Sequence, residues 1–116
     1  MDRYRQQANL LKLLAHPARL EILDVLRRDA ECVCHLSAAL HKPQPYISQQ
    51  LSILRNAGLI ADEKDGTKVF YRLADQQVLE RLDGILGPLP DALAPPGRRH
   101  APVAECACPK CRSNGG

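Results

Sequence analysis

The feature that most constrains the fold is a hairpin signal in a chain whose other apolar residues recur at helical spacing. The turn sequence Asp65-Gly66-Thr67 lies between Leu59-Ile60-Ala61 and Lys68-Val69-Phe70-Tyr71-Arg72-Leu73, and polar and apolar residues alternate along the second stretch. An Asp-Gly step between two such stretches favours a tight reversal between antiparallel strands. We therefore expect one hairpin within a mainly helical domain.

Five helices are predicted around this hairpin. The first ends at His16-Pro17, the next three span residues 17–28, 31–41 and 45–56, and the last contains Val78, Leu79, Leu82, Ile85 and Leu86. Proline suits the first turn of the second and fourth helices, and Gly58 supplies a stop for the fourth. The order is helix, helix, helix, helix, strand, strand, helix. A helix-turn-helix followed by a β-hairpin wing predicts a mainly α winged helix-turn-helix fold.

The composition changes sharply after Leu86. Six of the nine prolines and four of the seven glycines follow this residue, so residues 1–86 are predicted to form the folded domain and residues 87–116 a flexible tail. No apolar run approaches the ~20 residues that cross a bilayer, and the first residues lack the apolar segment of a signal peptide. We therefore expect a cytoplasmic protein with no membrane association.

The predicted DNA-reading face lies in a window without acids. No Asp or Glu occurs between Cys32 and Ala61, although the chain has 13 of them. Glutamine and serine can contact base edges in the major groove, whereas lysine and arginine hold phosphates. The alternative is an ordinary solvated face of an amphipathic helix. The predicted DNA-binding residues are Gln44, Tyr46, Ser48, Gln49, Gln50, Ser52 and Arg55 on the outward side of the fourth helix, and Lys64, Lys68 and Arg72 on the wing.

Three stretches together resemble the ArsR/SmtB family of metal-sensing repressors, over roughly residues 8–86. They are Leu13-Leu14-Ala15-His16-Pro17-Ala18-Arg19-Leu20-Glu21-Ile22-Leu23, Gln44-Pro45-Tyr46-Ile47-Ser48-Gln49-Gln50-Leu51 and Leu54-Arg55-Asn56-Ala57-Gly58-Leu59. The resemblance implies a homodimer joined by the first and last helices. It also implies a fourth helix that reads operator DNA, and release of the DNA when an inducer binds. The chain departs from the family at Gln49-Gln50, where many members carry His.

The terminal helices support a homodimer independently of the resemblance. They carry more apolar residues than a small core needs, and pairing would cover the excess. Two recognition helices one DNA turn apart then require a near-palindromic site in double-stranded DNA. The residues concerned are Leu10, Leu11, Leu13, Leu14, Leu82, Ile85 and Leu86.

A cysteine pair opens the predicted third helix. Cys32-Val33-Cys34 resembles the pair found there in arsenic-responsive and cadmium/lead-responsive members of the family. Residues two apart in a regular helix point to nearly opposite sides, so both sulfurs can bind one ion only if the first turn is distorted. The alternative is that each cysteine packs as a small apolar residue.

A second thiol cluster, Cys106-Ala107-Cys108-Pro109-Lys110-Cys111, lies in the predicted tail. It can form a separate site or share one with the first pair, so the predicted metal ligands are Cys32, Cys34, Cys106, Cys108 and Cys111. All-sulfur ligation favours soft ions. The expected inducer is As(III) or Sb(III), with Cd(II) or Pb(II) as the alternative.

Other functions remain as alternatives. A thiol-redox or persulfide-responsive repressor on the same fold would use the same cysteines, and a metal-buffering protein would bind metal without DNA. The last helix holds Asp75, Glu80 and Asp83 without a histidine, so the zinc-type site of the family is not expected there. Because the sequence has no Ser-His-Asp, paired-carboxylate or phosphate-loop signature, we expect no enzyme activity.

Overall fold

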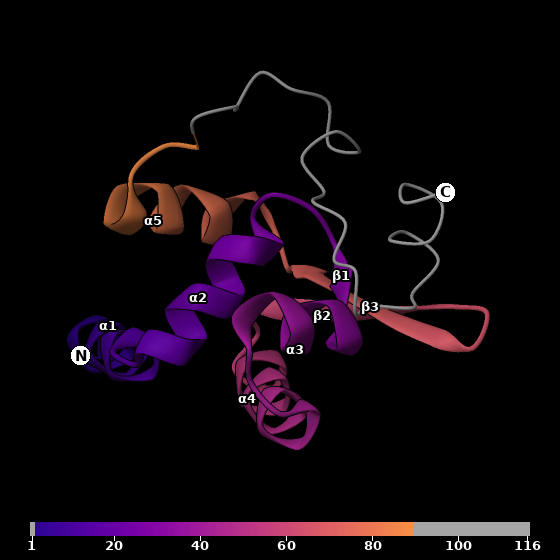
Figure 1. The fold of residues 1–116 in the computed structure, drawn as a ribbon. Coiled ribbons are helices and arrows are strands. Elements are labelled where there is room, and N and C mark those ends of the chain that lie inside the picture. Colours follow the sequence, from indigo (N-terminus) through magenta and orange to yellow (C-terminus); the bar gives the residue numbers. More distant parts are fainter. Residues whose placement is uncertain (1, 90–116) are drawn as a thin grey trace.

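The computed structural model describes residues 2–89. The described residues form a mainly helical domain with a small antiparallel sheet, and the sheet projects from the helices as a wing (Figure 1). This confirms the predicted winged helix-turn-helix. The elements in order are α1 (Asp2–Leu14), α2 (Pro17–Leu26), β1 (Glu31–Cys32), α3 (Val33–Leu40), α4 (Gln44–Asn56), β2 (Ile60–Asp65), β3 (Lys68–Leu73) and α5 (Gln76–Leu86).

The core lies where α2 meets α3, α4 and α5. Its residues are aliphatic, as the scarcity of aromatic residues requires, and recur three or four positions apart on each helix. Burial of each large side chain contributes about 1.5–3 kcal/mol. The fully or nearly fully buried members are Ile22, Leu23 and Leu26 of α2, Leu36 of α3, Ile47, Leu51 and Leu54 of α4, and Val78 and Leu82 of α5.

The third predicted helix, residues 31–41, is wrong at its start. Glu31 and Cys32 form the short strand β1, which pairs antiparallel with β3 so that Glu31 lies opposite Tyr71 and Cys32 opposite Phe70. Both residues of β1 are 2% exposed. The sheet therefore has three strands in the order β1-β3-β2. Pairing with a distant strand overrides the local helical pattern here, since each backbone group in the ladder gains a partner.

The turn between α3 and α4 depends on a left-handed residue. His41 has φ 56° and ψ 47°, a conformation that non-glycine residues seldom adopt. The Ser37 hydroxyl donates to the Lys42 carbonyl, and the Lys42 amide donates to the Ser37 carbonyl at 3.1 Å. Pro43 then precedes α4, which has no side-chain cap at its start. This turn fixes the angle between the two helices of the motif.

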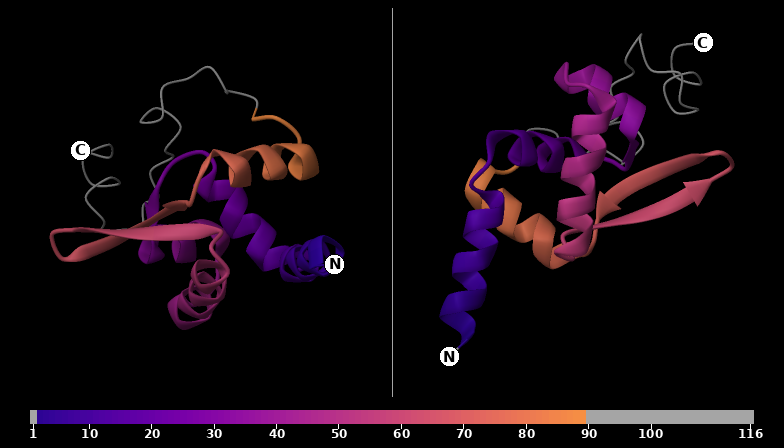
Figure 2. Two further views of the ribbon diagram at one scale, coloured as in Figure 1. Left: turned by 180° about the vertical axis from the view of Figure 1, so that it is seen from behind. Right: turned by 90° about the horizontal axis from the view of Figure 1, so that it is seen from below.

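The end of α4 and the hairpin match the sequence-based prediction closely. Gly58, at φ +80°, follows the helix, and the Leu59 amide bonds to the Leu54 carbonyl at 3.1 Å, which is the bond of a Schellman stop. At the hairpin, Asp65 pairs with Lys68 across a two-residue turn that begins with Gly66 at φ +66°. The hairpin extends away from the helices on the side opposite α1 (Figure 2).

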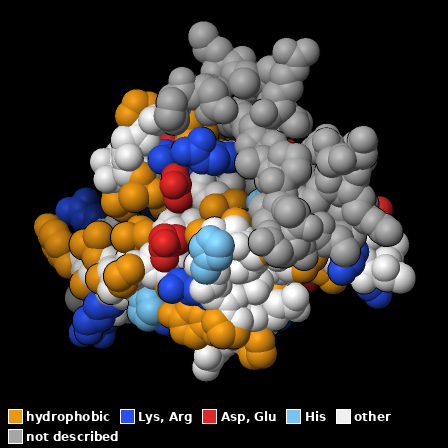
Figure 3. All heavy atoms as spheres, viewed as in Figure 1, with side chains coloured by type: hydrophobic (Ala, Val, Ile, Leu, Met, Phe, Trp, Pro, Cys, Tyr) orange, Lys and Arg blue, Asp and Glu red, His pale blue; other side chains and the backbone are white. Residues whose placement is uncertain are grey.

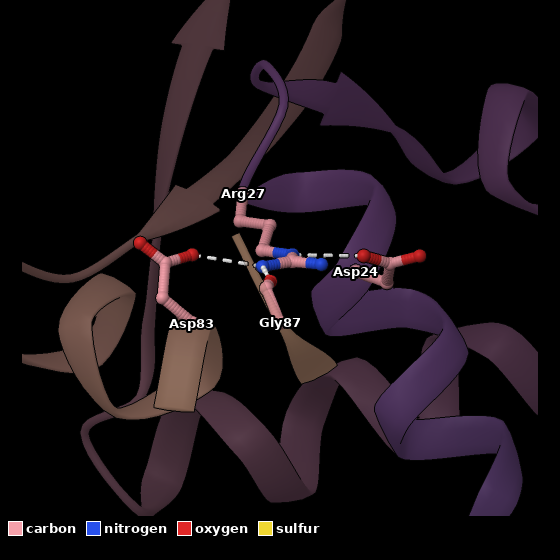
Figure 4. Close-up of polar contacts among 4 residues, drawn as sticks. All are labelled: Asp24, Arg27, Asp83 and Gly87. Carbon is pink, nitrogen blue, oxygen red and sulfur yellow. Dashed lines mark hydrogen bonds and ion pairs between the residues drawn. The ribbon is translucent and has the colours of Figure 1, made fainter. Parts of the chain in front are cut away.

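A buried arginine at the end of α2 joins this helix to α5. The Arg27 side chain is 4% exposed, and its guanidinium donates to Asp24 and to Asp83 at 2.8 Å each and to the Gly87 carbonyl at 2.6 Å (Figure 4). Helix α2 ends at Leu26, earlier than the predicted residue 28, with Arg27 as its C-cap. The packed part of the chain continues to Leu89, which is 8% exposed. No helix within residues 2–89 is long and apolar enough to cross a membrane.

Candidate nucleic-acid interface and thiol site

Helix α4 presents a polar face to solvent. Its apolar residues pack into the core, which leaves Gln44, Ser48, Gln49, Ser52 and Arg55 exposed. Tyr46 is half-buried against the core, with the Lys42 ammonium 6.0 Å from its ring centroid. The second helix of a helix-turn-helix enters the major groove, and short or amide side chains on such a face are suited to reading base edges.

Gln50, predicted to face outward, is 5% exposed and points into the protein. Its position three residues after Ile47 and four before Leu54 puts it on the inward side of α4. The Arg19 guanidinium donates to the Gln50 amide oxygen at 2.8 Å and to the Leu13 carbonyl at 3.1 Å. The outward placement was therefore wrong, and the helical spacing that identifies the core residues could have revealed it.

The three predicted basic contacts of the wing lie on both strands of the hairpin. Lys64 and Arg72 are exposed and Lys68 is half-buried. The acidic residues Asp62, Glu63 and Asp65 lie on β2 as well, so the wing is not uniformly basic. Arg55 of α4 makes an exposed 3.4 Å ion pair with Asp62. An exposed pair of this kind is weak, and phosphates can compete for the arginine.

The two cysteines of the first pair lie side by side. The Sγ atoms of Cys32 and Cys34 are 3.0 Å apart, Cys32 being buried and Cys34 half-buried. The strand β1 explains this geometry. Cys32 has the extended φ of −90° and ψ of 168° of a residue that precedes a helix, so the divergence expected of two helical residues does not arise. The strand-to-helix junction at Cys32 is therefore the distortion of the first turn that binding of one ion by both sulfurs requires.

The surroundings of the thiol pair are partly polar. The imidazole Nε2 of His35 lies 3.7 Å from a carboxylate oxygen of Glu31, and both side chains are nearly fully buried. Cys32 also packs against Phe70 of the wing. No group of three or more His, Cys, Asp or Glu within residues 2–89 is arranged to hold a metal ion. Cys106, Cys108 and Cys111 lie outside the described residues.

The donor set of the pair fits a soft ion. Two sulfurs at this separation can bind one atom together, and thiolates select soft ions over Mg²⁺ or Ca²⁺. A third sulfur would complete the trigonal set of a trivalent metalloid. The described residues thus offer two of the expected ligands.

Two of the three predicted α5 carboxylates are engaged within the fold. Asp75 accepts the Val78 amide at 3.0 Å as the helix cap, and Asp83 accepts from Arg27. Both contacts are structural: one satisfies an otherwise open amide at the start of α5, and the other ties α5 to α2.

The terminal helices expose apolar side chains. Tyr4 is 75% and Leu11 60% exposed on α1, and Ile85 and Leu86 at the end of α5 are 49% and 38% exposed. Figure 3 shows hydrophobic side chains at the surface over α1. Large exposed apolar residues on the terminal helices are typical of a protein–protein contact.

A helix-turn-helix formed by α3 and α4, followed by a hairpin, defines the winged helix-turn-helix class of proteins. The sequence profile of the family "Bacterial regulatory protein, arsR family" matches residues 16–62. The uncharacterized HTH-type transcriptional regulator MJ1325 of Methanocaldococcus jannaschii is 41% identical over 81 residues, which are 69% of this chain and 91% of that protein. The chain belongs to the ArsR family. The predicted resemblance is therefore confirmed, as is the prediction of a regulatory protein rather than an enzyme.

Other members of the family are similar over part of their length. The HTH-type transcriptional repressor SmtB of Mycobacterium tuberculosis is 48% identical over 69 residues, covering 60% of this chain and 51% of that protein. The chain thus spans about half the length of that relative. The arsenical resistance operon repressor of Escherichia coli is 47% identical over 66 residues, covering 56% of each.

A solved relative has the same fold. The homodimeric winged helix-turn-helix DNA-binding domain of Mb0332 from Mycobacterium bovis, a possible ArsR-family transcriptional regulator, aligns with a TM-score of 0.67 and 29% identity. The alignment covers 72% of this chain and 77% of that structure.

Proposed function

We propose that this protein is a homodimeric transcriptional repressor that binds operator DNA and releases it when its cysteines capture a thiophilic metal or metalloid. The observation that carries the proposal is the juxtaposition of the thiol pair with the DNA-reading motif. Cys32 and Cys34 lie at the start of α3, and α3 and α4 are the two helices of that motif. A ligand on the pair therefore acts at the support of the recognition helix.

The DNA-binding surface comprises the exposed polar face of α4 and the wing. Gln44, Ser48, Gln49, Ser52 and Arg55 would contact the major groove, with Tyr46 at its border, and Lys64, Lys68 and Arg72 the phosphates. Gln50 is not included, because it is buried against Arg19. Dimerisation through α1 and α5 would cover their exposed apolar residues. It would also present two copies of α4 to a near-palindromic site.

The favoured inducer is As(III) or Sb(III), with Cd(II) or Pb(II) as the alternative. The preference for the metalloids rests on the resemblance of Cys32-Val33-Cys34 to the cysteine pair of arsenic-responsive members of the family, and the chain is similar to an arsenical resistance operon repressor over 66 residues. Cys106, Cys108 and Cys111 are proposed as further ligands, at the same site or at a second one. When bound, the ion cross-links the thiolates, and the residues of the β1–α3 junction must adjust to hold it.

A second candidate is release triggered by oxidation. The 3.0 Å between the two Sγ atoms also allows a disulfide, in which both thiols lose a proton and one electron each to an oxidant. Release by an oxidant, with no response to metal ions, would select this function instead.

The test is an electrophoretic mobility shift of the full chain on the DNA upstream of its own operon, titrated with arsenite, antimonite, cadmium, lead and zinc. We expect arsenite or antimonite to release the DNA at the lowest concentration. Substituting Cys32→Ser and Cys34→Ser together should leave DNA binding intact and abolish release. The matched control replaces the three tail cysteines with serine, which reports whether the tail contributes ligands.

Two results would contradict the proposal. One is an unmodified chain that fails to bind the upstream DNA. The other is a Cys32→Ser, Cys34→Ser variant that is released as readily as the unmodified chain, which would assign sensing to other residues.

A further inference from the structure

The thiol pair and the predicted DNA contacts share one hollow. Its volume is about 300 Å³, and it is lined by Cys32 and Cys34 of the β1–α3 junction, Gln44 at the start of α4, and Thr67, Lys68 and Val69 at the tip and first residues of β3. Gln44 and Lys68 are also two of the proposed contacts to DNA. The surface that would hold the inducer is therefore continuous with residues that would hold the operator.

The register of the sheet explains why Lys68 lies beside the thiols. Cys32 is paired with Phe70, and Lys68 is two residues earlier on β3, so its side chain leaves the same face of the sheet as Phe70 and Cys32. Continued pairing would set Cys34 opposite Lys68. The chain instead turns into α3 at Val33, so β1 does not continue alongside the first residues of β3 (Figure 1). Lys68 and Val69 therefore line the hollow.

Gln44 reaches the hollow from the other helix of the motif. It is the first residue of α4 and is exposed. A short connection from α3, held by the Ser37–Lys42 bonds, precedes Gln44, which lines the hollow together with Cys32 and Cys34. The thiol junction, the recognition helix and the wing therefore meet at one place on the surface.

We propose that Gln44 and Lys68 transmit ligand capture to DNA, because a ligand held by Cys32 and Cys34 occupies the hollow that both side chains line and withdraws them from the operator. The inference rests on the proposed function. A ligand can shift a binding equilibrium only through a differential interaction with the two states. Here the operator-bound state needs Gln44 and Lys68 directed to DNA, and the ligand-bound state needs the hollow for the ligand.

The chain supplies a matched control for each residue. Lys64 is a second wing lysine. It lies on β2 opposite Val69 of β3, and it lines a different hollow with Ala30 and Phe70. Gln49 is a second exposed glutamine of α4 that does not line the thiol hollow. All four residues are proposed DNA contacts, so only the effect of the ligand separates the two pairs.

The experiment measures the dissociation constant of the full chain for its operator with and without saturating arsenite. The ratio of the two constants is the coupling, expected to be about 10-fold to 100-fold in the unmodified chain. Gln49→Ala and Lys64→Ala should weaken operator binding and leave the ratio unchanged within about twofold. Gln44→Ala and Lys68→Ala should lower the ratio to about a third or less, because the residue that the ligand displaces is gone.

A calorimetric measurement gives an independent readout. Coupling is reciprocal, so operator DNA must weaken arsenite binding by the same factor. This weakening should be smaller in Gln44→Ala and Lys68→Ala than in the two controls. Lys68→Met, which keeps the aliphatic stem of the half-buried lysine, serves as a second variant, and thermal unfolding confirms that each variant is folded.

The outcomes are distinguishable. If arsenite releases the unmodified chain and all four variants keep the same ratio, this inference is overturned and the proposed function stands. If the controls lose coupling as strongly as Gln44→Ala and Lys68→Ala, the effect is spread over the interface and the inference is also overturned. If arsenite does not release the unmodified chain, the inference fails together with the arsenite-responsive function.

Discussion

The two exposed faces of the molecule differ in kind. On one side, α1 and α5 leave Tyr4, Leu11 and Ile85 in solvent, whereas on the other, α4 exposes amides, hydroxyls and an arginine. Burial of the first face against protein is favourable, since apolar area leaves water. The second face has little apolar area to bury and many hydrogen-bonding groups. The difference indicates two partners, a protein surface for one face and a nucleic acid for the other.

An arginine of α2 bonds to the helix behind each face. Arg19 lies behind α4 and bonds to a neutral amide and a backbone carbonyl, whereas Arg27 lies behind α5 and bonds to two carboxylates and a carbonyl. Both sets of bonds are charge-assisted, because the guanidinium donor is ionised in each. Asp24 lies on α2 itself, so Asp83 and the Gly87 carbonyl are the acceptors that join α5 to α2.

The largest effect should follow from introducing charges into the apolar face. Leu11→Glu together with Ile85→Glu places like charges where two copies would meet. We expect the chain to become monomeric and to bind its operator about 100-fold more weakly or worse, because two linked recognition helices gain a large effective concentration over one. Analytical ultracentrifugation and fluorescence anisotropy on operator DNA measure the two changes.

The control for this experiment keeps the face apolar. Leu11→Met with Ile85→Val should remain dimeric and bind the operator normally. The double-glutamate variant could instead be monomeric and still bind the operator at full strength. DNA binding would then not depend on dimerisation, and the apolar face and the recognition helix would not be functionally linked.

The recognition helix was predictable because its information is local. Apolar residues at helical spacing, a proline in the first turn and a glycine stop identify α4 within one residue of its observed start. The pattern also determines which side faces inward, and the position of Gln50 follows from it. Asp65-Gly66 identifies the hairpin in the same way.

The geometry of the thiol site was not predictable from local pattern. Whether Cys32 is helical depends on whether Glu31 and Cys32 pair with β3, which lies far along the sequence. That pairing turns a helical step, in which two side chains diverge, into a strand-to-helix junction in which they meet. The Arg19–Gln50 bond is likewise a contact between distant segments, and no spacing rule specifies it.

A smaller effect is expected at the support of the apolar face. Arg27→Met should lower the free energy of unfolding by about 2–3 kcal/mol, because charge-assisted bonds are lost from a buried side chain. Asp24 and Asp83 are about 40% exposed, so their carboxylates stay hydrated and add little further cost. Urea unfolding measures the change, with the exposed Arg81→Met on α5 as the control. A loss no larger than that of Arg81→Met would show that the buried bonds do not stabilise α5.

The smallest effect, and the sharpest test of how the recognition helix is held, is expected at Arg19 and Gln50. Arg19→Ala leaves the Gln50 amide buried without its donor, which should cost about 1–2 kcal/mol of stability. Gln50→Leu should cost less, since an apolar side chain fills the space and Arg19 keeps its bond to the Leu13 carbonyl. A double-mutant cycle on urea unfolding then isolates the contribution of the bond itself.

The adjacent glutamines Gln49 and Gln50 of α4 allow a test of base reading. Gln49 is exposed and Gln50 is bonded to Arg19. On a panel of operators with single base changes, Gln49→Ala should relax the discrimination at one position, because a bidentate glutamine–adenine contact contributes about 1–3 kcal/mol. Gln50→Leu should weaken binding to every operator by the same small factor, since it alters only how firmly α4 is held. If Gln50→Leu instead relaxes one position as Gln49→Ala does, Gln50 leaves Arg19 to reach the DNA, and the inward face of α4 takes part in reading.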